Sequence, residues 1–594
     1  MKNFERLTFI GIALSALLGL IFLRMIYLQY SQSGQDLKTK SDRFYMHNQK
    51  VLDPERGAIY DRFGNLLASN KMVYEVGIDL TEPARNPYTV AKYLSNLLGK
   101  DFTEIYNLAG AADKPSLNDY NILADFVDGT TIAKITALQN SLAASPERAL
   151  EGSKTPGTLA GVDWKPHMIR EYPEGTLASN IIGFYSFLDR QTGGPHFGVE
   201  EEFGGILAGV GQTVDVSTQP RDASDIPMIP PGDSLVLTIN RSMQQAVEKI
   251  LDKAVEKNKA VSGTVIVYDP KTGEILAMAT NPRIDPNKYS DSWDTIQNGH
   301  SYDRAIDITY EPGSVFKVLT MASALDSGAV TPESIFVDTG SIELGGYTIY
   351  DWDRNAWGRQ NMTGCMQHSL NVCLTWVAEQ LGPTRFYSYM KAFGVGQYTN
   401  VDLAGEKITP LAVPGDNNWY PINLGTNSFG QGLAVTPIQM VQSVGAVANN
   451  GKMMYPHLVK AIIKNGEKTE FAPRQIGQPI TAKTAHTLTN MLAVSLEEEA
   501  STALVDGYRL AGKTGTAEIP SPQGYISNVT NASFVGWGPV DDPQFVVYVW
   551  LEKPKSSIWG SIVASPVFAD VVQQLVVLMD IPSDAQRQQI ASKN

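Results

Sequence analysis

The first long apolar run of the chain lies at its N-terminus. Residues 7–23 carry no charge, and residues 25–28 extend the run beyond Arg24, whose long side chain can reach the membrane surface. About 22 residues at roughly 1.5 Å each give a helix long enough to cross the hydrocarbon core of a bilayer. A cleaved signal peptide is the alternative, but its apolar region is usually only about 7–15 residues long. The pattern therefore predicts a retained transmembrane helix within residues 1–30 that contacts membrane lipid.

The hydrophobic pattern of residues 31–229 is irregular. Short strand-like runs alternate with many glycines and prolines, and no helical period is sustained. Residues 56–68 predict a strand, a Gly-Asn turn and a second strand. Residues 230–233, Pro-Pro-Gly-Asp, then interrupt the chain and predict a domain boundary. We expect an irregular, mostly-β domain over residues 31–229.

The pattern is sharper over residues 230–582. A helix with an apolar stripe is predicted after Asn240, which can cap it, and a very apolar helix is predicted over residues 567–579. Paired apolar runs predict hairpins over residues 264–280 and 533–551. Strands at both ends with helices between them indicate an α/β domain in which helices cover an antiparallel sheet. Residues 583–594 are expected to form a C-terminal tail.

Composition narrows the function classes. At 594 residues the chain is too long for one core, and its hydrophobic (43%) and charged (19%) fractions are typical of globular proteins. The net charge of −14 argues against a dedicated nucleic-acid-binding protein. The seven histidines form no H-E-x-x-H motif and no i, i+4 pair, so zinc catalysis has no support. We expect no metal and no other cofactor.

The chain has two cysteines, Cys365 and Cys373, too few to staple a protein of this size. Their apolar surroundings favour two buried free thiols. A disulfide between them, across the loop that carries Ser369, is the alternative for a domain outside the cell. A metal site with His368 is disfavoured.

Candidate chemistry begins at residues 311–317, Glu-Pro-Gly-Ser-Val-Phe-Lys, which suit the start of a helix. Residues three apart share a helix face, so the Ser314 hydroxyl and the Lys317 amine can meet. Serine becomes a nucleophile when a base takes its proton. Lysine can be that base if burial or a neighbouring cation lowers its pKa.

Two further triplets follow, Ser369-Leu370-Asn371 ahead of a helical stretch and Lys513-Thr514-Gly515 in a strand-like run. Each pattern alone is weak evidence, because the chain repeats all three elsewhere, at residues 388–391, 116–118 and 271–273. Their order and their placement at a helix start, a loop–helix junction and a strand are those of penicillin-binding proteins and serine β-lactamases.

The chain resembles a class B penicillin-binding protein, a peptidoglycan D,D-transpeptidase of the FtsI and penicillin-binding protein 2 type. The likeness includes residues 56–68, 198–200 and 429–432, and so extends along the whole chain. It implies a cytoplasmic tail and membrane anchor (1–30), a pedestal of the dimerisation-domain type (31–229) and a penicillin-binding transpeptidase domain (230–582). It also implies that the catalytic domain lies outside the bacterial cytoplasmic membrane, an orientation that the charges around the helix leave open.

The resemblance implies a role for each catalytic residue. Ser314 would attack a stem peptide and form an acyl-enzyme, with Lys317 as its base. Ser369 would relay a proton to the leaving amine, and Asn371 would bind Lys317 and the substrate amide. Lys513 would help to keep Lys317 neutral.

The Lys-Thr-Gly-Thr segment, residues 513–516, is the expected binding site for the substrate. The resemblance implies that Lys513 and Thr514 hold the terminal carboxylate of the stem peptide or of a β-lactam. Gly515 and Thr516 would complete this wall, and the backbone N–H groups of Ser314 and Thr516 would form the oxyanion hole.

Two alternatives remain: a serine β-lactamase-like hydrolase, and a non-catalytic scaffold for cell division. An anchor and a long pedestal are not needed by a β-lactamase, and a complete set of motifs is not needed by a scaffold.

We expect no intrinsic glycosyltransferase. The resemblance implies a membrane glycosyltransferase partner of the shape, elongation, division and sporulation family. The triplet Ser-x-Asn and the pedestal length favour cell division over elongation. Stem-peptide composition, acceptor amine and oligomeric state are left open.

Overall fold

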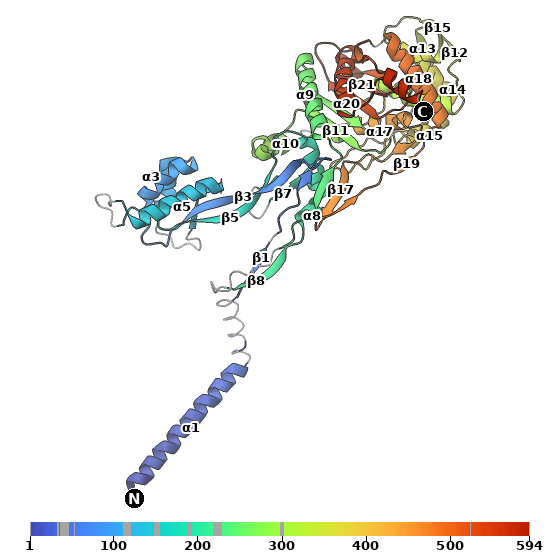
Figure 1. The fold of residues 1–594 in the computed structure, drawn as a ribbon. Helices are drawn as coiled ribbons and strands as arrows, with labels where there is room; N and C mark the ends of the chain where they lie inside the picture. Colours follow the sequence, from blue (N-terminus) through green and yellow to red (C-terminus); the bar gives the residue numbers. More distant parts are fainter. Residues whose placement is uncertain are drawn as a thin grey trace. The chain divides into compact units, whose positions relative to one another are not determined.

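The fold was analysed in a computed structural model. It describes residues 2–31, 35, 47–52, 54–110, 120–147, 155–187, 193–217, 229–297, 302–499, 501–522 and 524–592. Figure 1 shows the helices and strands of the chain. The chain divides into two compact units. The first unit comprises Met1–Arg56 and Ala208–Gly232, and the second comprises Gly57–Leu207 and Asp233–Asn594.

The first unit contains one long helix and a two-stranded ladder. Helix α1 (Lys2–Tyr30) includes a 23-residue stretch, Thr8–Tyr30, with a mean hydropathy of 2.3 and no buried part. The predicted apolar helix is therefore present, and it is suited to anchor the chain in a membrane. Strand β1 (His47–Leu52) pairs antiparallel with β8 (Gln212–Ser217).

The second unit begins with the predicted hairpin. Strands β2 (Ile59–Tyr60) and β3 (Leu66–Asp79) pair antiparallel, which confirms the strand, turn and strand expected over residues 56–68. Strand β3 continues well past the hairpin and pairs with β4 (Tyr120–Val127) and β5 (Val162–Glu171).

Three helices that the sequence analysis did not predict cover part of this sheet: α3 (Pro87–Leu98), α4 (Phe102–Gly110) and α5 (Gly129–Ala144). Asn86 and Asp128 cap the first and the third by accepting backbone N–H bonds. The helices bury small apolar sets, such as Val90, Ala91 and Leu94, against Val76 and Ile78 of β3. These stripes are too short to stand out from a chain rich in glycine and proline.

The sheet also crosses the predicted boundary at residue 230. Its strand order is β18-β17-β9-β2-β3-β4, where β9 (Ser234–Leu237) lies parallel to β2 and pairs with β17 (Val459–Lys464). Strand β18 (Glu467–Glu470) forms its edge. Strands on both sides of the boundary thus share one set of backbone hydrogen bonds. Shorter elements between β5 and β8 are α6 (Ser179–Ile182), β6 (Phe184–Ser186), β7 (Gly194–His196), α7 (Gly198–Glu202) and α8 (Gly204–Ala208).

The predicted antiparallel sheet lies after residue 260 and has the strand order β11-β10-β22-β21-β20. Both predicted hairpins are present, β10 with β11 and β21 with β22. The strands are β10 (Ser262–Tyr268), β11 (Ile275–Asn281), β20 (Ala511–Ser521), β21 (Gly524–Gly538) and β22 (Phe545–Glu552).

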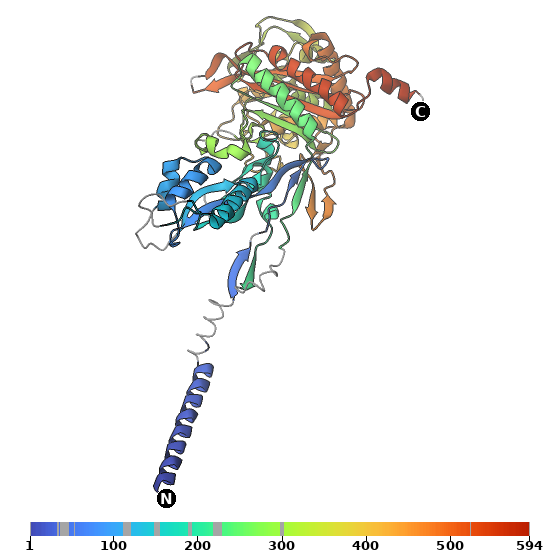
Figure 2. The same cartoon turned by 60° about the vertical axis from the view of Figure 1, so that its left-hand side comes forward.

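Helices cover both faces of this sheet. Along β10, Val265 and Val267 enter one core, whereas Ile266 and Tyr268 enter the other, as alternation along a strand requires. The predicted helices α9 (Arg241–Asn258, capped by Asn240) and α20 (Ser565–Leu578) pack side by side on the first face (Figure 2). Residues 560–578 are also long and apolar enough to span a membrane, but 56% of that stretch is buried in this core.

The second face carries helices α12 (Lys317–Asp326), α17 (Pro437–Ala448) and α18 (Ala482–Glu499). The residues expected as a tail form helix α21 (Asp584–Ala591). The remaining elements are η2 (Pro286–Ser292), α10 (Trp293–Gln297), α11 (Arg304–Asp307), η3 (Gly313–Phe316), β12 (Ile335–Asp338), β13 (Ser341–Leu344), β14 (Tyr347–Tyr350), β15 (Gly358–Asn361), α13 (Met362–Gln367), α14 (Asn371–Leu381), α15 (Pro383–Ala392), α16 (Pro421–Ser428), β16 (Met453–Met454), β19 (Gln475–Gly477), η4 (Ser501–Ala503) and α19 (Gly560–Val563).

Candidate active site

The candidate nucleophile lies where a tight turn enters a buried helix. Ser314 is half-buried in the 3₁₀ turn η3, and α12 begins at Lys317, three residues later. Gly313 has φ +61°, and a Cβ atom there would lie 2.9 Å from the carbonyl oxygen of Thr516. Only glycine allows this close approach, so the residue before Ser314 brings the turn against strand β20.

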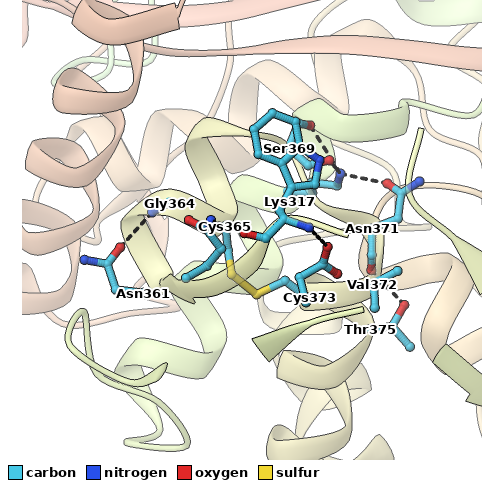
Figure 3. The surroundings of a disulfide bond; sticks show 12 residues. Lys317, Asn361, Gly364, Cys365, Ser369, Asn371, Val372, Cys373 and Thr375 are labelled. Carbon is cyan, nitrogen blue, oxygen red and sulfur yellow. Dashed lines mark hydrogen bonds between the residues drawn. A yellow bond between two sulfur atoms is a disulfide. The ribbon is translucent and has the colours of Figure 1, made fainter. Parts of the chain in front are cut away.

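Lys317 connects two of the predicted motifs. Its side chain is fully buried, and Nζ donates to the Ser369 carbonyl oxygen at 2.6 Å and to Asn371 Oδ1 at 2.8 Å (Figure 3). Nζ also lies 3.2 Å from Ser369 Oγ. The side chains of the Ser-x-x-Lys and Ser-x-Asn motifs therefore meet, although 52 residues separate Lys317 from Ser369.

Burial sets the charge of this lysine. Desolvation lowers the pKa of Lys317 well below its ordinary value, and the positive charge of Lys513 lowers it further. The carboxylate of Asp351 acts in the opposite direction. A lysine in this environment gives up its proton far more readily than one on the surface, as a general base must.

The Ser-x-Asn segment forms a turn between two helices. Ser369 lies between α13 and α14 with φ +54°, a left-handed conformation that serine rarely adopts. Strain of this kind persists when the surrounding structure holds it, and it occurs often at active sites. Here the Ser369 carbonyl oxygen, turned toward Lys317, is part of that support.

A disulfide joins Cys365 to Cys373 across this turn, so the expectation of two free thiols was wrong (Figure 3). Both cysteines are fully buried, one in α13 and one in α14, with their Cα atoms 6.0 Å apart. This is an ordinary separation for a disulfide. Apolar surroundings indicated burial correctly, but only the turn between the two helices brings the sulfur atoms together.

The Lys-Thr-Gly-Thr segment runs along β20 beside Ser314 and the rest of η3. Lys513 is 5% exposed, and its charge acts on Lys317. A Cβ atom at Gly515 would lie 2.2 Å from Ser533 Oγ and 2.9 Å from a methyl group of Val315, so glycine lets the strand lie against η3. The Thr516 hydroxyl accepts the Gly560 N–H at 3.0 Å.

The repeated motifs lie elsewhere. Ser388 and Lys391 are exposed on α15, away from the other two motifs. Lys271 is exposed in the turn between β10 and β11 and forms an ion pair with Asp542. The third repeat, at residues 116–118, lies outside the described residues.

The three motifs line one groove with a volume of about 1000 Å³. Residues from every predicted site position except Lys317 and Gly515 contribute to its surface, together with Asp351, Trp352, Tyr525 and Trp559. Asp351 and Tyr525 were missed by sequence reasoning, because neither belongs to a recognisable motif. Among the described residues no group of His, Cys, Asp and Glu side chains is arranged to hold a metal ion.

Comparisons with known proteins agree with this geometry. The family model described as the penicillin-binding protein transpeptidase domain matches residues 263–573. The model of the penicillin-binding protein dimerisation domain matches residues 51–191. Together they cover the groove and most of the pedestal.

Curated relatives match nearly the whole chain. Stage V sporulation protein D of Bacillus subtilis is 31% identical over 570 residues, which is 93% of this chain and 82% of that protein. The peptidoglycan D,D-transpeptidase FtsI homolog of Mesostigma viride is 26% identical over 616 residues, which is 98% of this chain and 97% of that protein.

Solved structures show the same fold. Penicillin-binding protein 3 of Mycobacterium tuberculosis, complexed with aztreonam, has a TM-score of 0.66 at 25% identity and covers 90% of this chain and 98% of its own. Penicillin-binding protein 2X of Streptococcus thermophilus has a TM-score of 0.73 at 21% identity and covers 89% of this chain and 80% of its own. The matched domains, the relatives and the groove lead to one conclusion: this chain belongs to the class B penicillin-binding proteins, the D,D-transpeptidases of peptidoglycan.

Proposed function

We propose that the chain crosslinks peptidoglycan stem peptides through an ester formed on Ser314. The observation that carries this assignment is the buried amine of Lys317, one turn from Ser314 and bonded to Ser369 and Asn371. Ser314 Oγ attacks the carbonyl carbon of the penultimate D-Ala, and its proton passes to Lys317 Nζ. The backbone N–H groups of Ser314 and Thr516 stabilise the tetrahedral oxyanion.

Collapse of that intermediate breaks the bond to the terminal D-Ala. Its amine leaves with a proton that Ser369 relays from Lys317, a route supported by the 3.2 Å between Ser369 Oγ and Lys317 Nζ. An amine of a second stem peptide then attacks the ester, and Ser314 regains its proton. This sequence conserves the number of peptide bonds, so the reaction needs no nucleotide or other cofactor.

The terminal carboxylate of the stem peptide binds to Lys513 and Thr514 of β20, and Gly515 and Thr516 extend the wall beneath it. A β-lactam carries its carboxylate at the corresponding place and acylates the same serine. The groove holds Lys513, Thr514 and Ser314 on its surface, which supports this placement.

Labelling with a fluorescent penicillin tests the assignment. Ser314→Ala should fold but lose covalent label, because no oxygen remains to form the ester. Ser388→Ala changes the same residue type at the exposed repeat and should label fully. Label retained by the first variant, or lost by the second, would refute Ser314 as the nucleophile. Slow release of bound penicillin would separate a transpeptidase from a β-lactamase-like hydrolase.

We also propose that α1 holds the chain in the bacterial cytoplasmic membrane with the groove on the outer side. The Cys365–Cys373 disulfide supports this orientation, because disulfides persist in oxidising compartments and are rare in the cytosol. Protease added to intact protoplasts should digest the catalytic domain. Protection until the membrane is opened would refute the orientation.

The proposed partner is a membrane glycosyltransferase of the shape, elongation, division and sporulation family, which supplies the glycan strands. The small residues of α1, Gly11, Ala13, Ser15, Ala16 and Gly19, permit close helix packing in the bilayer. Given lipid-linked disaccharide, the purified chain should make no polymer, and polymer made by this chain alone would refute the division of labour. If the glycosyltransferase still co-purifies after α1 is replaced by an unrelated helix, the contact lies in the pedestal instead. Septal location of a fluorescent fusion would support a division role over elongation.

A further inference from the structure

One buried carboxylate beside the groove is not accounted for by the three motifs. Asp351 follows β14 and is 2% exposed. Its Oδ1 accepts the backbone N–H of Val372 at 3.1 Å, and the preceding carbonyl oxygen, of Tyr350, accepts Asn371 Nδ2 at 3.2 Å. The end of β14 therefore holds both Asn371 and the residue after it, at the first turn of α14.

The second carboxylate oxygen, Asp351 Oδ2, is buried and receives no hydrogen bond from the described residues. Burial raises the pKa of Asp351, and the direct interaction between the carboxyl groups of Asp351 and Asp338 raises it further. The Asp338 carboxylate, at the end of β12, accepts the backbone N–H groups of Gly340 and Trp357. Charged or titratable groups on the elements around Asp351 are Lys317 of α12, Glu343 of β13, Glu379 of α14, His368 before α14, and Asp353 and Arg354 in the loop after Asp351. Of these, Lys317 acts on the Asp351 carboxyl, and Lys513 of β20 acts on Lys317.

We propose that Asp351 is a positioning residue for acyl transfer: it fixes the Ser369–Asn371 turn and stabilises the ammonium form of Lys317 after that lysine takes the Ser314 proton. The proposal deepens the proposed function and rests on Lys317 as the base. The proton still moves from Ser314 Oγ to Lys317 Nζ, and Asp351 itself exchanges none with the substrate.

The electrostatics explain why such a group is useful. Burial and the charge of Lys513 both lower the pKa of Lys317, and a base whose pKa falls too far cannot hold the proton that it removes. Asp351 is the group that raises it again. Burial, helped by Asp338, raises the pKa of Asp351 itself to about 6, so the carboxyl is ionised at neutral pH and loses its charge in mild acid.

Asp351→Asn tests the charge separately from the geometry, because the amide oxygen can still accept the Val372 N–H. The measurement is the second-order rate of acylation by benzylpenicillin across pH, on the full chain in detergent. We expect the plateau rate to fall several-fold, since the ammonium is less stable. We also expect the acid limb to move to lower pH, because the ionised wild-type carboxylate, present above about pH 6, favours the protonated lysine and the amide does not. Asp353→Asn, the same change two residues later, should leave the profile unchanged.

A lower plateau with an unmoved acid limb would reduce Asp351 to a structural role and overturn the proposal, as would an unchanged profile. If the Asn variant does not fold, Asp351→Thr, whose hydroxyl oxygen lies one bond short of Oδ1, removes the same charge and carries the same expectation for the acid limb. Failure here is distinct from failure of the proposed function. Ser314→Ala decides the nucleophile whatever Asp351 does, and an unmoved limb with Ser314 confirmed would reject Asp351 alone.

Discussion

Two Ser-x-x-Lys segments lie on helices of this domain, and their surroundings make them chemically different. Lys317 is fully buried and bonded to Ser369 and Asn371, whereas Ser388 and Lys391 are exposed on α15. The helix brings serine and lysine to one face in both places. Burial and the neighbouring cation Lys513 lower the pKa of Lys317. The Ser-x-x-Lys spacing places serine and lysine on one helix face, but the pKa of the lysine depends on the tertiary structure around it.

Removing the lysine of each Ser-x-x-Lys segment should give the largest difference in acylation rate between the two segments. Lys317→Ala is expected to slow acylation by fluorescent penicillin at least about a hundredfold, the scale of a lost general base. Lys391→Ala should leave the rate unchanged, because that side chain is in water. Thermal unfolding would show that both variants fold. Near-normal acylation of the Lys317 variant would remove lysine from the role of base.

The neighbouring cation provides the next largest effect. Lys513→Ala should weaken apparent binding of a carboxylate-bearing β-lactam by about 10- to 100-fold, the scale of a charge-assisted hydrogen bond. The loss of a positive charge also raises the pKa of Lys317, so the acid limb of acylation should move to higher pH, opposite to Asp351→Asn.

The matched control is Lys271→Ala, in the Lys-Thr-Gly repeat of a surface turn. It loses one exposed ion pair with Asp542 and should bind β-lactams normally. If both lysine variants bind equally well, Lys513 does not hold the carboxylate.

The disulfide should have the smallest effect of the three changes. Replacing Cys365 and Cys373 together by serine removes a cross-link between residues 8 apart in the chain, worth about 2–3 kcal/mol by the loop-entropy relation. Urea unfolding measures this loss, and acylation should slow only modestly because Lys317 and Asp351 still hold the turn. An unchanged urea midpoint would show that the disulfide does not stabilise the fold.

Local patterns predicted the catalytic domain well and the pedestal poorly. The hairpins, the capped helix α9 and the apolar helix α20 follow from alternation, turn residues and a helical period, and all are present. Helices α3, α4 and α5 were missed, because their apolar faces are short and become stable only when packed on β3. A sheet that joins β9 and β17 to β2 depends on contacts far apart in sequence, and no local pattern reports them.

The sequence by itself determined the apolar N-terminal helix, the three motifs and their order, because each depends on residues that are near one another in the chain. Only the tertiary structure decided which Ser-x-x-Lys segment meets a Ser-x-Asn turn, that Cys365 pairs with Cys373, and that Asp351 lies behind Val372. The physical reason is desolvation: the pKa of Lys317 and the effect of a nearby carboxylate depend on how completely water is excluded, and water is excluded by side chains from distant parts of the chain.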